Sequence, residues 1–352
     1  MLNSKRMSRR KLIKGVCASS LLGGTFSIAP AARSQSRTLY VNSYGGVWET
    51  SWRKAFFAPF TAQTGIEVKP VSPVSFAKLK AQVQTKLYEW DLTNLGDVEF
   101  AVGMHENLLE KIDTSIIKKD QLPPNMVRDY GVVSYSLGTN LVYRKDKFPN
   151  GGPQSWADFW DVKKFPGSRC LFDRSFTTLA FALLADGVPR DKLYPMDVDR
   201  AFRKLNEIKP HIKVWWTQAA QSQQLIRDEV DMIAMWSARA VELIENHVPL
   251  EIIWNGAEVY DATLCVPKGD PNAKIAWEFI NFVSQAKPQA NLAMLLPYGP
   301  ANPNARALMP EARLRLTPAW PDNEKVSFHH DAAWLAPHMP AIRERWSQWL
   351  AT

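Results

Sequence analysis

The sequence has few cysteines and histidines, and it contains no long, uninterrupted apolar run. Its 352 residues include 3 Cys and 6 His, which argues against a disulfide framework or a zinc module. Cys170 and Cys265 each lie in an apolar run, which favours two buried, unpaired thiols over a disulfide. The apolar stretch 15–29 is short and interrupted by Gly and Ser, so it does not suit a membrane span.

The sequence motifs of common enzyme classes are also missing. We find no Gly-x-Ser-x-Gly, His-Glu-x-x-His, phosphate loop or Gly-x-Gly-x-x-Gly. His329 and His330, followed by Asp331, form the densest group of metal-ligand types, but adjacent side chains point in different directions and seldom share one ion. We therefore expect no enzymatic activity, no cofactor and no metal site.

The net charge of +8 does not indicate a nucleic-acid partner. Six positive charges lie before residue 15, at positions 5, 6, 9, 10, 11 and 14, so about +2 remains for the rest of the chain. No lysine-rich stripe with interleaved aromatic residues is present. Nucleic acid is therefore not an expected partner.

The first residues have the pattern of an export signal. The pair Arg9-Arg10 precedes the apolar stretch 15–29, and the small residues Ala29-Pro30-Ala31 follow. This order is typical of a twin-arginine signal peptide. We predict that residues 1–31 are cleaved and that the working protein is soluble and periplasmic.

Beyond residue 36, short apolar strands alternate with amphipathic helices, which predicts an α/β fold. The predicted strands are 38–43, 66–71, 91–95, 169–172, 212–216, 232–236, 250–254 and 258–266, and 131–144 has the pattern of a hairpin. The predicted helices are 47–64 (ending at Gly65), 75–85, 155–160 (with a serine cap), 177–185, 220–227, 237–246, 272–284 and 340–350. This order suggests two α/β lobes that are interleaved in the sequence: 36–138 with 263–308, and 139–262 with 309–352. A cleft between such lobes is the default position for a small ligand.

Several segments together resemble the periplasmic solute-binding proteins of ABC importers, in the polyamine (spermidine/putrescine)-binding branch of extracellular solute-binding family 1. These segments are Phe60–Val68, Trp90–Thr93, Ser155–Trp160, Trp277–Phe282 and Tyr298–Pro303. The resemblance implies a type II periplasmic binding protein fold, with two hinged lobes that close on one small ligand. It also implies a monomer that performs no chemistry and delivers its ligand to an inner-membrane ABC permease.

The resemblance places the ligand in loops that follow the strands of both lobes. Trp236 and Tyr260 match positions at which the family has aromatic walls, whereas Trp48, Trp215 and Trp216 are expected in the core. The candidate ligand-binding residues are Tyr44, Gly45, Gly46, Gly96, Asp97, Asp173, Arg174, Thr177, Trp236, Arg239, Tyr260 and Asp261.

The pocket departs from the family pattern at its acidic positions. Arg174 stands where the family has an acid, and Arg239 adds a second cation. These arginines suit a ligand carboxylate, with Asp97 or Asp261 holding an amine, as for an ω-amino acid. The alternative is an ordinary diamine, with Arg174 turned outward or paired with Asp173. A receptor that presents its ligand to a sensor, or an extracytoplasmic enzyme on the same fold, remains open as well.

Overall fold

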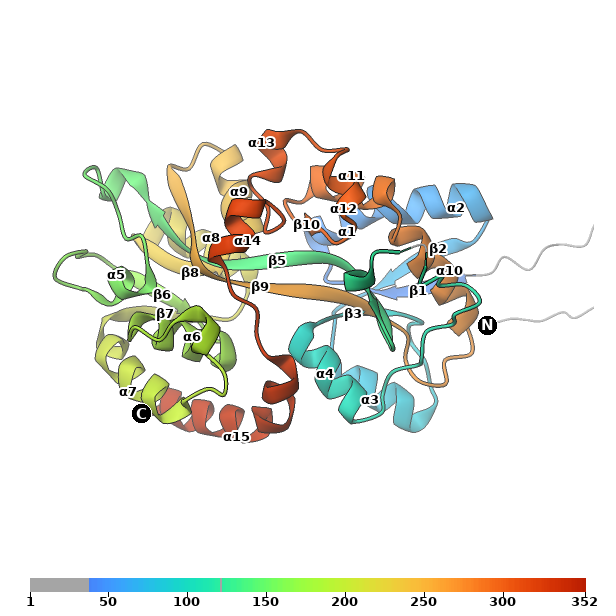
Figure 1. Ribbon diagram of the computed structural model, residues 1–352, viewed down its shortest axis with the longest axis horizontal. Coiled ribbons are helices and arrows are strands. Elements are labelled where there is room, and N and C mark those ends of the chain that lie inside the picture. Colours follow the sequence, from blue (N-terminus) through green and yellow to red (C-terminus); the bar gives the residue numbers. More distant parts are fainter. Residues whose placement is uncertain (1–37, 121) are drawn as a thin grey trace, which may run out of the picture. The chain divides into compact units, whose positions relative to one another are not determined.

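The computed structural model describes residues 38–120 and 122–352 (Figure 1). The predicted signal peptide, residues 1–31, lies outside the described residues. The strands are β1 (Thr38–Asn42), β2 (Glu67–Val71), β3 (Thr93–Gly96), β4 (Val127–Arg128), β5 (Gly131–Arg144), β6 (Arg169–Phe172), β7 (Ile212–Trp216), β8 (Met232–Trp236), β9 (Leu250–Cys265) and β10 (Gly299–Pro300).

Helices alternate with these strands, as predicted. They are α1 (Gly46–Trp52), α2 (Ala58–Thr64), α3 (Phe76–Thr85), α4 (Asp97–His105), α5 (Trp156–Trp160), α6 (Ser175–Ala185), α7 (Val198–Ile208), α8 (Ala219–Gln224), α9 (Ser237–Glu245), α10 (Ala273–Val283), α11 (Ala286–Leu295), α12 (Pro303–Arg306), α13 (Glu311–Leu314), α14 (Pro321–Val326) and α15 (Ala332–Ala351). Two short π-helical segments, Arg53–Phe57 and Leu225–Glu229, continue α1 and α8. In the described part of the chain, no helix is both long and apolar enough to cross a bilayer.

The strands form two sheets. β1 and β2 pair in parallel, and a larger mixed sheet has the order β3-β9-β5-β8-β6-β7, with β4 and β10 paired to β5. The late strand β9 therefore lies between the earlier strands β3 and β5, with both of which it pairs antiparallel. β9, which follows β8 in the chain, thus joins β3 to the rest of the sheet.

The longest strands, β5 and β9, lie side by side across the sheet (Figure 1). They pair from Val132↔Leu264 to Arg144↔Leu250, with irregularities after Val133 and after Thr139. The predicted hairpin at 131–144 is wrong, because this segment is one continuous strand. The prediction of separate strands at 250–254 and 258–266 is wrong for the same reason. Residues that suggest turns, such as Gly256 with a φ of 71°, instead lie where the pairing is irregular.

Two large apolar clusters stabilise the two ends of this sheet. One contains Trp52, Phe56 and Phe279 with other side chains of α1, α2 and α10, and the other contains Phe181 and Trp346 with side chains of α6, α7 and α15. Aromatic side chains bury the largest apolar area per residue, so these clusters hold most helices against the sheet. The residue limits of the two lobes stay a prediction.

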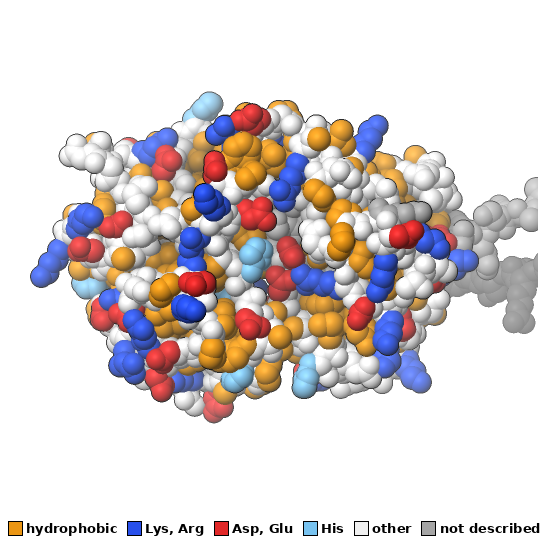
Figure 2. Space-filling model, viewed as in Figure 1, with side chains coloured by type: hydrophobic (Ala, Val, Ile, Leu, Met, Phe, Trp, Pro, Cys, Tyr) orange, Lys and Arg blue, Asp and Glu red, His pale blue; other side chains and the backbone are white. Residues whose placement is uncertain are grey.

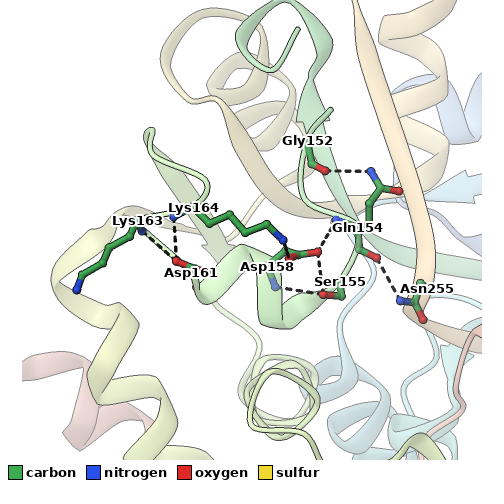
Figure 3. Close-up of polar contacts among 8 residues, drawn as sticks. All are labelled: Gly152, Gln154, Ser155, Asp158, Asp161, Lys163, Lys164 and Asn255. Carbon is green, nitrogen blue, oxygen red and sulfur yellow. Dashed lines mark hydrogen bonds and ion pairs between the residues drawn. The ribbon is translucent and has the colours of Figure 1, made fainter. Parts of the chain in front are cut away.

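Local caps agree with the sequence signals. Gly65 ends α2 with a φ of 72°, as its position predicts. The Ser155 hydroxyl accepts a hydrogen bond from the N–H of Asp158 (3.1 Å), and the Asp158 carboxylate accepts one from the N–H of Gln154 (3.0 Å; Figure 3). The predicted serine cap is confirmed, and Asn255 of β9 donates to the Gln154 carbonyl (3.1 Å; Figure 3), which fixes α5 against the long strand. Cys170 and Cys265 are buried and unpaired, as predicted.

A buried carboxyl before α10 makes stability depend on pH. Burial, assisted by the charge of Asp91, raises the pKa of Asp270 to about 7. Since the folded chain then binds a proton more tightly than the unfolded chain, stability falls as pH rises from about 4 to about 7 and is level above that range. Asp270→Asn is expected to stabilise the protein by about 1–3 kcal/mol at pH 8 and to have little effect near pH 4.

Urea unfolding at pH 4.5, 6 and 8 measures this effect. Asp191→Asn, at an exposed position, is the matched control and should change stability by less than about 0.5 kcal/mol at each pH. An Asp270→Asn variant with the same pH slope as the wild type would contradict the assignment.

Candidate ligand-binding site

Four helices begin beside residues that the sequence predicts in the pocket. Gly45, Gly96, Arg174 and Trp236 immediately precede α1, α4, α6 and α9, and no side chain caps these helix ends within the described residues. The N–H groups and the positive dipole at such ends favour a negatively charged ligand group. Gly45 and Gly46 have φ values of 72° and 53°, which glycine adopts without strain.

Arg174 lies at the centre of a group of charged and aromatic side chains. Its guanidinium is 4.3 Å from the ring centroid of Phe176 and 5.0 Å from that of Tyr260. It also lies 3.7 Å from the carboxylate of Glu99 on α4 and 3.9 Å from that of Glu258 on β9. Burial would lower the pKa of Arg174, but these two carboxylates raise it above its usual value, so the group stays charged.

Glu258 is fully buried and ionised. Burial would raise its pKa, but the hydrogen bond and charge of His330, with the charge of Arg174, lower the pKa of Glu258 to about 2. Its Oε1 atom accepts hydrogen bonds from the Thr177 hydroxyl (2.8 Å) and from Nε2–H of His330 (2.6 Å). His330 Nδ1 contacts the Tyr194 hydroxyl, which completes a buried chain. Thr177, predicted as a ligand residue, thus holds Glu258 in place.

Aromatic side chains extend the site from Tyr44, just before α1, to Tyr298, just before β10. The rings of Tyr44 and Trp48 meet edge to face at 5.5 Å, and the Tyr44 hydroxyl donates to the Asn94 carbonyl at 3.4 Å. The Trp48 indole donates to the Tyr135 hydroxyl (3.0 Å), and Tyr135 stacks on Tyr298 at 4.6 Å. Trp48 is 3% exposed, so it is a core residue as predicted. Tyr44 is 55% exposed and remains accessible to a ligand.

Arg239 provides a second cation near the same tyrosines. Ala238, the neighbour of Arg239, packs in one apolar cluster with Tyr135 and Tyr298. Burial raises the pKa of Tyr298 to about 12, while the charge of Arg239 lowers it and that of Glu242 raises it. Arg239 pairs with Glu242 at 3.1 Å and keeps 21% of its side chain exposed. Trp236, at the start of the same helix, has a buried indole N–H with no partner among the described residues.

Asp97 and Asp261 lie together but already have a cationic partner. The Arg128 guanidinium is 2.7 Å from Asp97 and 3.0 Å from Asp261, and Asp97 accepts a hydrogen bond from the N–H of Asp261 (2.8 Å). Neighbouring residues of a strand point to opposite faces. Tyr260 therefore faces Arg174, whereas Asp261 faces Arg128. A ligand-binding role for Asp97 and Asp261 stays a prediction.

Asp173 turns away from its neighbour Arg174. Its carboxylate accepts a hydrogen bond from the Trp346 indole of α15 at 2.7 Å. The alternative in which Arg174 pairs with Asp173 or points outward therefore differs from the structure, where Arg174 pairs with two other carboxylates. Trp216 is fully buried in the core, as expected. Trp215 is partly buried and packs edge to face on Trp346 at 5.6 Å, at the border of a core cluster.

Sequence reasoning missed three residues of this site: Glu99, Glu258 and Tyr298. Glu258 had a detectable signal, because it is a single charge in the otherwise apolar segment 257–260 of a predicted strand. Glu99 follows the predicted Gly96 by three residues, within the first turn of α4. Neither position reveals its partner, because Arg174 is distant from both in the sequence.

Charges of both signs are interspersed on the face of the molecule that Figure 2 shows. Lys and Arg side chains alternate there with Asp and Glu, without a broad area of one sign. This distribution agrees with the small net charge that remains beyond the first residues.

The long strands, the paired apolar clusters and the charged aromatic site define the class of the protein: a solute-binding protein with the two-lobed α/β fold of periplasmic receptors. The family of bacterial extracellular solute-binding proteins matches residues 55–326, and the chain belongs to this family. It is the substrate-binding component of an ABC transporter, and proteins of this family bind small ligands and deliver them to permeases.

Named relatives support the family assignment over nearly the whole chain. A gamma-aminobutyric acid-binding protein of Pseudomonas aeruginosa is 35% identical over 94% of this chain and 96% of its own length. The spermidine/putrescine-binding periplasmic protein of Escherichia coli is 22% identical over 92% of each chain. The binding protein AgtB of Agrobacterium tumefaciens R10, solved in complex with agropinic acid, has a TM-score of 0.81 and 33% identity over 90% of this chain and 99% of its own.

A solved structure of a GABA receptor is similar to this chain to about the same extent as AgtB is. It has a TM-score of 0.82 and 35% identity, covering 89% of this chain and 97% of the receptor. These comparisons confirm the expected fold class and the expected class of function.

Proposed function

We propose that this protein captures a small ligand with one amine and one carboxylate, such as the ω-amino acid γ-aminobutyrate. The ligand lies between the lobes formed by residues 36–138 with 263–308 and by residues 139–262 with 309–352, and the protein delivers it to an inner-membrane ABC permease. Residues 1–31 act as a cleaved twin-arginine signal that brings the protein to the periplasm, where it works without catalytic turnover.

The observation that carries this proposal is that groups of both charges lie beside the predicted ligand-binding residues. Arg239 and the free helix end of α9 offer a positive wall for a carboxylate. Glu99 Oε2 and Glu258 Oε2 are buried acceptor atoms without a partner among residues 38–120 and 122–352. A buried acceptor of this kind favours a ligand that donates a hydrogen bond, as an ammonium does.

The similarity to named relatives supports the same ligand class. The relative with 35% identity is named as a gamma-aminobutyric acid-binding protein. The relatives named for spermidine and putrescine are only 22–23% identical to this chain. Tyr135 and Tyr298 pack in one apolar cluster with Ala238, the neighbour of Arg239, and give this part of α9 an aromatic support.

Thermal unfolding with a panel of ligands tests the proposal. At a concentration 100-fold above its dissociation constant, a ligand stabilises the native state by about 2.7 kcal/mol, which raises the melting temperature by several degrees. We expect this shift with millimolar γ-aminobutyrate and a shift below about 1 °C with putrescine or spermidine. Stabilisation by the diamine and the polyamine alone would reject the proposed ligand class.

A further inference from the structure

Arg174 occupies an environment that would itself suit an organic cation. Its guanidinium lies between the rings of Phe176 (4.3 Å) and Tyr260 (5.0 Å), as an alkylammonium does in an aromatic binding site. The carboxylates of Glu99 (3.7 Å) and Glu258 (3.9 Å) complete its surroundings. Only 18% of the Arg174 side chain is exposed, so the guanidinium fills this position rather than lining its entrance.

The surrounding groups come from three separate elements, so the site is built by the fold and not by one local turn. Glu99 belongs to α4, Phe176 to α6, and both Glu258 and Tyr260 to β9. Glu258 and Tyr260 are two residues apart and therefore point to the same face of the strand. Gly96 lies next to the group, because a Cβ atom there would be 3.8 Å from Arg174 and 3.6 Å from Tyr260.

The charges around Arg174 do not cancel. Two carboxylates face one guanidinium, and each carboxylate keeps one buried oxygen without a partner in the described part of the chain. Arg174, Glu99 and Glu258 together carry one negative charge, which matches one ammonium group and not two.

We propose that Arg174 is a built-in cation that fills one ammonium position of the site, so that the protein accepts ligands with one amine and excludes diamines. This inference rests on the proposed amine-binding function and names the residue that sets its selectivity. A diamine would have to place its second ammonium where the guanidinium already lies, and no carboxylate charge would remain to balance it.

Replacing Arg174 should open this position to a second amine. The Arg174→Ala variant, prepared as the mature protein without its signal peptide, is expected to bind putrescine at least 10-fold more tightly than the wild type. Isothermal titration calorimetry measures both affinities. Millimolar methylguanidinium should compete with putrescine in this variant, because it fits the vacated position. Arg174→Lys, which retains a tethered cation, should gain less than twofold for putrescine, and Arg203→Ala, an exposed arginine of α7, should gain nothing.

Glu99→Gln provides a second test that does not depend on the folding of the alanine variant. If Arg174 balances the two carboxylates, removal of one charge should weaken γ-aminobutyrate binding at least 10-fold. If Arg174 instead holds the ligand carboxylate, the same change should leave binding equal or stronger, which would overturn the inference. A folded Arg174→Ala protein without a gain for putrescine would also overturn it.

The two proposals fail in different ways. A wild type that binds no γ-aminobutyrate, with an Arg174→Ala variant that gains putrescine binding, rejects the proposed ligand and supports the role of Arg174. A wild type that binds γ-aminobutyrate, with an alanine variant that gains nothing, supports the ligand and rejects the role of Arg174.

Discussion

Replacing Arg239 by alanine is expected to weaken γ-aminobutyrate binding about 100-fold or more, or about 2.7 kcal/mol. The guanidinium is the accessible cation of the α9 wall, with 21% of its side chain exposed, and only Glu242 pairs with it among the described residues. Removing it leaves a ligand carboxylate in a partly buried site without its bidentate partner, which is costly because the charge is desolvated.

Calorimetry with γ-aminobutyrate and with putrescine measures this effect. Arg203→Ala is the matched control, since it removes an exposed arginine outside the site and should change the affinity less than twofold. If Arg239→Ala binds γ-aminobutyrate as tightly as the wild type, the carboxylate does not lie at α9 and the proposed orientation of the ligand is wrong.

Replacing Arg169 by alanine should destabilise the protein by about 3–5 kcal/mol. Arg169 begins β6 and is 1% exposed. Its guanidinium donates hydrogen bonds to the carbonyls of Phe159, Phe165 and Gly167, so it fastens the loop after α5 to the sheet. Alanine would leave these carbonyls without a donor and would leave a cavity against the Phe159 ring.

Two further variants separate the contributions to this loss. Arg169→Met fills most of the volume but donates no hydrogen bond, so it should recover part of the lost stability and no more. Arg203→Ala should change stability by less than about 0.5 kcal/mol. A loss below about 1 kcal/mol in urea unfolding of Arg169→Ala would contradict the structural role of this arginine.

Much of the secondary structure was predictable because its signals are local. The strands Arg169–Phe172, Ile212–Trp216 and Met232–Trp236 agree with their predicted bounds, since each is a compact apolar run. The glycine end of α2 and the serine cap of α5 depend on single residues whose chemistry is unambiguous.

The errors occur where tertiary packing overrides local signals. Gly138 and Asn140 suggest a turn within 131–144, but pairing with β8 and β9 keeps this segment extended. The last helix was predicted from residue 340, but it begins at Ala332 and includes Pro337 and Pro340. Its apolar side chains Leu335 and Met339 are buried in the cluster with α6 and α7, which supports the first turns.

The same difference between local signals and long-range contacts applies to the candidate site. Arg174 and Tyr260 could be selected from the sequence because they match positions of the family pocket. Their carboxylate partners could not, because Glu99 lies 75 residues before Arg174 and Glu258 lies 84 residues after it. Such contacts follow from the assembled sheet and leave no pattern in a short window of sequence.

The central position of β9 has a consequence for biosynthesis. Because β9 separates β3 from β5, the sheet has a gap until residue 265 has left the ribosome. Most of the polypeptide must therefore be translated before β3 can join the rest of the sheet, and the molecule cannot mature piece by piece as a tandem array of domains does. A chain that stops before this strand should be captured by chaperones or degraded, not released as a stable half.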